Sequence, residues 1–175
     1  MDRPAIGLAL HPDEEYLERV TPLYESEAEL LELAPETTWA LDERGALVAN
    51  GFHDRFLALG RRLRLPFVAH GVGLSPGTAD APERRARWLA QVAASHRDFE
   101  FRWYTEHLGL TVLDGLEMTL PLGLPMTPAA AAITRACLAE MRAVVPTVGL
   151  ENTAIYFTLG EPLHEPDFIT GILGA

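Results

Sequence analysis

Short apolar runs alternate along this chain with longer segments in which apolar residues recur at helical spacing. Five runs have the length of buried strands: residues 5–10, 30–34, 66–69, 100–105 and 147–151. Each of the first four runs is followed by a segment whose apolar residues recur at helical spacing. These segments start near Pro12, Asn50, Ala81 and Pro128. Strands that alternate with helices at this interval predict βα units, and therefore a parallel sheet or barrel of the α/β class.

Capping residues indicate where two of the helices begin. Asn50 suits the N-cap of a helix that runs to Arg62, because its side-chain oxygen can accept a backbone N–H of the first turn. Thr127 is expected to cap a helix over residues 128–144, whose proline stands at the favoured first position.

Two loops interrupt the regular pattern. Residues 71–77 have the sequence GVGLSPG, and their glycines would let the backbone approach a bound group closely. The stretch from Gly109 to Met126 contains two glycines and two prolines between its ends and shows no clear period. It is long enough to act as an active-site lid.

Side chains that can bind metals stand where the predicted strands end. These are Glu36, His70, the adjacent pair Glu106 and His107, and Glu151. In a βα barrel the active site lies at the C-terminal ends of the strands, so these residues point to one shared mouth. We therefore predict that His70, Glu106 and Glu151 converge on one site.

Adjacent strand residues point to opposite faces of a sheet, which bears on the pair Glu106 and His107. Only one of them should face the barrel interior, unless a bulge at the strand end turns both toward the mouth. The open alternatives are an ion-paired Glu106 and a structural His70 held by backbone carbonyls. His53, His96 and His164 have no companion ligands and are expected at the surface.

Length and charge narrow the class of protein. A chain of 175 residues suits a single domain but is short for an eight-stranded barrel, so residues 1–175 are expected to form part of one. The net charge is −11 and every basic residue is Arg, which argues against a nucleic-acid partner. The sequence has no apolar run that would span a membrane and no signal peptide pattern, so we expect a cytoplasmic protein.

A single cysteine, Cys137, leaves no thiolate cluster for zinc and lies in an apolar helix, where we expect a core residue rather than a nucleophile. A metal site in this chain must therefore use nitrogen and oxygen ligands. Such ligands suit iron or manganese, with zinc as a further candidate. The ligand types leave hydrolysis and oxygen chemistry both open.

The motifs HGVGLSPG, EHLG, LPLGLPMT and LENT follow IGLALH and ELAPE in this order. With them, the chain resembles the multinuclear non-heme iron-dependent oxidative enzymes along nearly all of its length. The resemblance implies a xylose-isomerase-like TIM barrel, of which about five parallel strands are present here, as in an N-terminal portion truncated at the C-terminus. It also implies two or three iron ions, which with O2 oxidise residues, often cysteine, of a ribosomally synthesised precursor peptide that a small partner protein delivers.

The resemblance assigns ligands by position. His70, Glu106 and Glu151 match metal ligands of the family, and His11 and Glu36 match further ligands at the ends of the first two strands. His107 and Asn152 fall near the site, and no catalytic residue is assigned.

Two other hypotheses predict different behaviour. A divalent-metal isomerase or endonuclease with the same barrel would work without O2. A truncated barrel could instead be a non-catalytic binding module, in which unpaired strand edges would favour a homodimer or the addition of a peptide strand.

Overall fold

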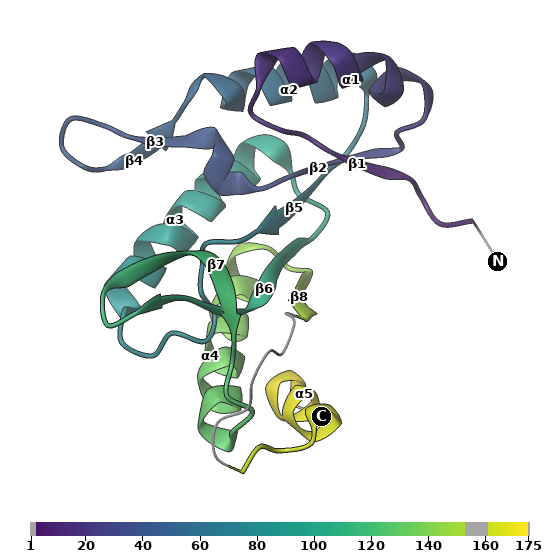
Figure 1. Ribbon diagram of the computed structural model, residues 1–175. Helices are drawn as coiled ribbons and strands as arrows, with labels where there is room; N and C mark the ends of the chain where they lie inside the picture. Colours follow the sequence, from purple (N-terminus) through teal and green to yellow (C-terminus); the bar gives the residue numbers. More distant parts are fainter. Residues whose placement is uncertain (1–2, 153–160, 175) are drawn as a thin grey trace. The chain divides into compact units, whose positions relative to one another are not determined.

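The computed structural model describes residues 3–152 and 161–174, in which helices follow strands along the chain (Figure 1). The strands are β1 (Gly7–Ala9), β2 (Leu30–Leu33), β3 (Trp39–Leu41), β4 (Leu47–Ala49), β5 (Phe67–Gly71), β6 (Tyr104–Leu113), β7 (Leu116–Gly123) and β8 (Val148–Asn152). The helices are α1 (Glu14–Ser26), the short 3-10 helix η1 (Pro35–Thr38), α2 (Gly51–Leu63), α3 (Pro82–Phe99), α4 (Pro128–Val144) and α5 (Glu165–Leu173). None of the described helices is long and apolar enough to cross a membrane.

The main sheet has the strand order β1-β2-β5-β6-β7, and β8 pairs with β6. The ladders from β1 to β2 and from β2 to β5 are parallel, with Leu8 opposite Leu31 and Leu33 opposite Ala69. Strands β1, β2, β5, β6 and β8 correspond to the five strands expected from the sequence, and the α/β class and the partial TIM barrel are confirmed. The bounds of the fourth strand were wrong: β6 begins at Tyr104 instead of spanning residues 100–105, so Glu106 and His107 lie near its start rather than at its end.

Contacts along the chain define two compact units, residues 1–71 with 91–104 and residues 72–90 with 105–175. In the first unit, α2 begins as predicted, since the Asn50 side chain accepts the N–H of Phe52 at 2.9 Å. Its core contains Phe67 and Phe99, whose rings meet edge to face at 5.0 Å. The hydroxyl of the buried Tyr24 donates to the carbonyl of Ala9 at 2.8 Å, which ties α1 to the end of β1.

In the second unit, α4 spans the predicted residues 128–144 and Thr127 caps it by accepting the N–H of Ala130 at 3.2 Å. Its buried face recurs at helical spacing: Ala130, Ala131, Thr134, Cys137, Leu138 and Met141. Helix α5 packs against α4, where the Arg135 Nε donates to the carbonyl of Gly171 at 2.7 Å.

The expected irregular lid at residues 109–126 is wrong, because most of this stretch forms the antiparallel hairpin of β6 and β7. Its turn is Asp114-Gly115, and both residues have positive φ, 49° and 74°. Asp-Gly between alternating apolar residues is a strong hairpin signal, which the two prolines of the segment obscured.

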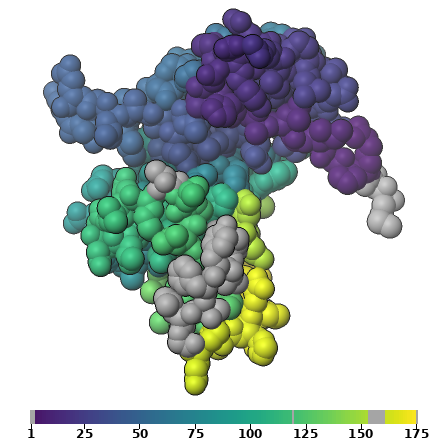
Figure 2. Space-filling view, in the orientation of Figure 1, coloured from purple at the N-terminus to yellow at the C-terminus, as the bar shows by residue number. Residues whose placement is uncertain are grey.

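A second hairpin was not predicted at all. Strands β3 and β4 pair antiparallel around a turn in which the Asp42 carboxylate accepts the N–H groups of Arg44 and Ala46, both at 2.8 Å. Gly45 follows with a φ of 75°. Figure 2 shows this hairpin, in blue, as a projection from the first unit. Asp followed by Gly three residues later is the local signal that could have revealed it.

The surface position expected for His53 is also wrong. Its side chain is buried. The ring packs against Phe99, with 4.9 Å between the ring centroids, and Nε2 lies 3.0 Å from a carboxylate oxygen of Asp98, which satisfies the buried nitrogen. His96 is half-buried and stacks on Phe101, whereas His164 is exposed as expected.

Candidate metal centre

His107 and Glu151 face each other across two paired strands, β6 and β8. The His107 Nδ1 lies 3.9 Å from a Glu151 carboxylate oxygen, and the two side chains are 21% and 53% exposed. Two ligands of one metal ion, each about 2 Å from it, stand at most about 4 Å apart. The separation of this pair therefore suits two ligands of one ion as well as an ion pair.

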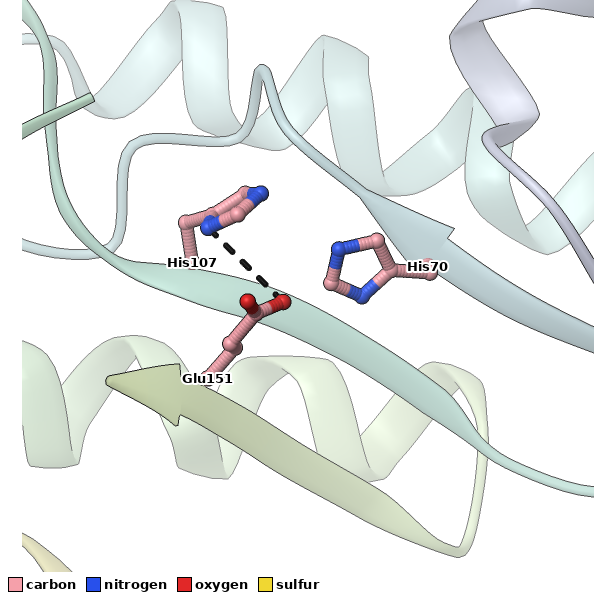
Figure 3. A group of neighbouring side chains, drawn as sticks. All are labelled: His70, His107 and Glu151. Atoms are coloured by element: carbon pink, nitrogen blue, oxygen red, sulfur yellow. Dashed lines mark ion pairs between the residues drawn. The ribbon is translucent and has the colours of Figure 1, made fainter. Parts of the chain in front are cut away.

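His70 is the fourth of five residues in β5, a strand whose other residues are buried. Figure 3 draws its imidazole with the side chains of His107 and Glu151. Each of the three offers one ligand atom, and these atoms lie within 4.8 Å of one another. Imidazole nitrogens and a carboxylate oxygen are donors that transition-metal ions accept, so the residues fit a metal.

The donor set indicates which metals fit. Two imidazoles and one carboxylate supply nitrogen and oxygen ligands, with no thiolate. This set, when it leaves further coordination positions open, is typical of the non-heme iron oxygenases. Because Glu151 is half-exposed, water or a substrate can reach the carboxylate side of the group.

Glu106 lies outside this group. Its side chain is fully buried, and its negative charge helps to raise the pKa of the buried Cys137 thiol on α4. Strand alternation explains the difference, because neighbours in β6 point to opposite faces. The sequence ranked Glu106 as a ligand and His107 as a near-site residue; the structure groups His107 with His70 and Glu151, and ligation by Glu106 stays a prediction.

Three other predicted residues also lie outside the group. His11 follows β1, is exposed, and has its ring 5.4 Å from that of Tyr16. Glu36 is half-buried in η1, after β2. Asn152 ends β8 beside Glu151 and borders a cavity of about 20 Å³, room for roughly one water. Their roles at a metal stay predictions.

The glycine-rich loop after His70 packs closely against the protein's own side chains at two of its glycines. A Cβ on Gly73 would come within 2.3 Å of the Trp88 ring, and one on Gly77 within 2.1 Å of Leu124. Arg84 clamps the same loop, since its guanidinium donates to the carbonyl of Gly73 at 2.8 Å and lies over the Trp88 ring. The two glycines thus allow the loop to pack closely on Trp88 and Leu124, and Arg84 ties it to α3.

Burial raises the pKa of the Cys137 thiol to about 12; Arg85 lowers the pKa, and the carboxylates of Glu140 and Glu106 raise it. We expect the native protein to react with iodoacetamide at pH 8 much more slowly than the urea-unfolded chain, because the thiolate is the nucleophile. The thiol should contribute stability below about pH 9, and this contribution should be lost as pH rises toward 12. Equal alkylation rates in the two states would contradict the buried position.

Comparisons with known proteins place the chain in a family. No curated protein sequence matches it. Among solved structures, it is similar to endonuclease IV from Thermus thermophilus, with 15% identity, a TM-score of 0.45, and coverage of 86% of this chain and 52% of that one. The chain therefore spans about half the length of that enzyme.

The sequence profile of the family described as RiPP precursor modification enzyme MbnB/TglH/ChrH matches residues 7–175. This chain belongs to that family of enzymes, which modify ribosomally synthesised precursor peptides.

Proposed function

We propose that this chain takes part in the oxidation of a precursor peptide by O2 at a non-heme iron site, with cysteine as the residue modified. The observation that carries the proposal is the group of two histidines and one carboxylate, His70, His107 and Glu151, in a chain of a peptide-modifying family. That ligand set leaves open positions for O2 and a substrate on iron.

In this proposal the three side chains hold the iron, and the bound iron supplies electron transfer between the peptide and O2. His107 and Glu151 come from neighbouring strands, so the sheet rather than a loop sets their spacing. The loop that Arg84 clamps would keep the strand end at His70 from moving. Rigid supports of this kind preserve a binding geometry to a fraction of an ångström.

The partners follow from the same proposal. The precursor peptide is the substrate, a small protein delivers it, and the protein works in the cytoplasm. Two or three irons bind, with Glu106, His11 and Glu36 as the further ligands that the sequence assigns. A homodimer through exposed strand edges is part of the same proposal.

Anaerobic reconstitution with Fe(II), followed by metal analysis, tests the proposal directly. We expect at least about one bound iron per chain, and O2 uptake that requires both the iron and a cysteine-containing precursor peptide. Reconstitution with Zn(II) serves as the control, because zinc fits the ligands but has no redox chemistry. Turnover with Zn(II) and no O2 uptake with Fe(II) would instead support a hydrolase or isomerase.

A further inference from the structure

A hollow in the first unit is lined by four arginines, Arg61, Arg64, Arg97 and Arg102, which we call the arginine hollow. Its volume is about 650 Å³, within the range of ligand-binding pockets. The buried side chains of Leu57, Phe67 and Phe99 also line it.

The arginines of the hollow differ from most others in the same unit. Elsewhere in this unit, Arg3, Arg19, Arg55 and Arg62 each pair with a glutamate at 2.5–2.8 Å. Among the described residues, none of the four arginines of the hollow has a carboxylate at ion-pair distance. Two carboxylates, Asp98 and Glu100, also line the hollow, and Asp98 lies 3.0 Å from the His53 Nε2. The four guanidinium groups outnumber them, so in a chain of net charge −11 the hollow has a positive lining that suits an external anion.

The favourable interaction of a cation with a helix C-terminus explains the positions of only two of the four arginines. Arg61 and Arg97 lie in the last turns of α2 and α3, where a cation complements the helix dipole. Arg102 lies outside both helices, held by its backbone N–H, which donates to the carbonyl of Phe67 at 2.9 Å. Arg64 follows α2 with a φ of 57°, a left-handed position that favours glycine.

Glu100 repeats this pattern at the end of α3. It has a φ of 52° and also lines the hollow. Two left-handed positions where glycine would be less strained therefore carry charged side chains around one cavity. Backbone strain of this kind is concentrated at binding sites, because the side chain has a use that offsets its cost.

The chemistry of the walls selects the ligand. The carbonyls of Gly60, Arg61 and His96 at the ends of α2 and α3 already accept backbone N–H groups of the following residues, so the guanidinium groups are left to recognise the ligand. The family acts on precursor peptides, and an acidic peptide segment supplies carboxylates for these guanidinium groups. Guanidinium groups bind carboxylates through two parallel hydrogen bonds. We propose that the arginine hollow binds an acidic segment of a peptide. That this segment belongs to the precursor peptide rests on the proposed function above.

The test measures binding of fluorescein-labelled hexaglutamate by fluorescence anisotropy, with hexaglutamine as the neutral reference. Arg64→Gly should weaken hexaglutamate binding about two- to fivefold, the range for one exposed ion pair. Glu100→Gly should strengthen binding by a similar factor because it removes a negative charge. Both variants should raise the Tm, since glycine relieves the left-handed backbone. A purely structural role would leave the two affinities equal.

Arg44→Ala is the charge-matched control, because Arg44 is an exposed residue of the β3–β4 turn and does not line the hollow. Arg44→Ala should bind hexaglutamate with the same affinity as the native protein, within experimental error. The double variant Arg61→Ala, Arg97→Ala should lower the affinity about tenfold, because it removes two ion pairs. Equal binding of hexaglutamate and hexaglutamine would overturn the proposal. Displacement of hexaglutamate by equimolar pyrophosphate would also overturn it in favour of a phosphate site. The assay needs neither iron nor turnover, so its failure is separate from failure of the proposed oxidation.

Discussion

Fe(II) binding is expected to fall by more than about a hundredfold when His107 is replaced by Ala. Loss of a residue that only orients a ligand costs about 10- to 100-fold in metal affinity, and loss of a ligand costs more. The His107 side chain is 21% exposed and lies beside Glu151, so its removal leaves a polar gap rather than an apolar cavity. The fold should therefore be retained, as measured by circular dichroism and Tm. Anaerobic titration with Fe(II) measures the affinity.

Two further variants sharpen this experiment. His164→Ala removes an exposed imidazole that makes no side-chain cap bond at the start of α5, and it should bind iron as the native protein does. Glu106→Gln separates the two faces of β6. If His107, not Glu106, faces the metal, this variant should retain most of the iron. Retention by His107→Ala together with loss in Glu106→Gln would show that the glutamate is the ligand.

Ser75→Ala is expected to lower the free energy of unfolding by about 2–6 kcal/mol. The buried Ser75 hydroxyl accepts the backbone N–H groups of Thr111 at 2.8 Å and Val112 at 3.2 Å. Its removal leaves two buried donors unsatisfied, at about 1–3 kcal/mol each. Urea unfolding followed by circular dichroism measures the change.

Glycine at the same position provides a second measurement. Ser75 has a φ of 63°, so Ser75→Gly should be about 1 kcal/mol less destabilising than Ser75→Ala, although both lose the same hydrogen bonds. Thr111→Val is the local control, because its hydroxyl makes only a long contact of 3.4 Å to the carbonyl of Gly73. A cost for Ser75→Ala no larger than that for Thr111→Val would contradict the bracing role of the hydroxyl.

Local features of the sequence determined much of the fold. The caps Asn50 and Thr127 act through hydrogen bonds to residues two or three positions away, so the starts of α2 and α4 could be predicted to the residue. The alternation of strands and helices likewise predicted five parallel strands, because burial on both faces makes such strands continuously apolar. The positions of His70 and Glu151 near strand ends followed directly from that alternation.

Tertiary structure decided the features that depend on contacts between distant residues. The sequence alone could not choose between Glu106 and His107, because the face of β6 that meets Glu151 is set by the register of β6 with its neighbouring strands. Burial of His53 depends on Asp98 and Phe99, which are 45 or more residues away. The arginine hollow likewise forms only where the ends of α2 and α3 border the start of β5. Local propensity acts over a few residues, whereas these sites are assembled by packing across the whole chain.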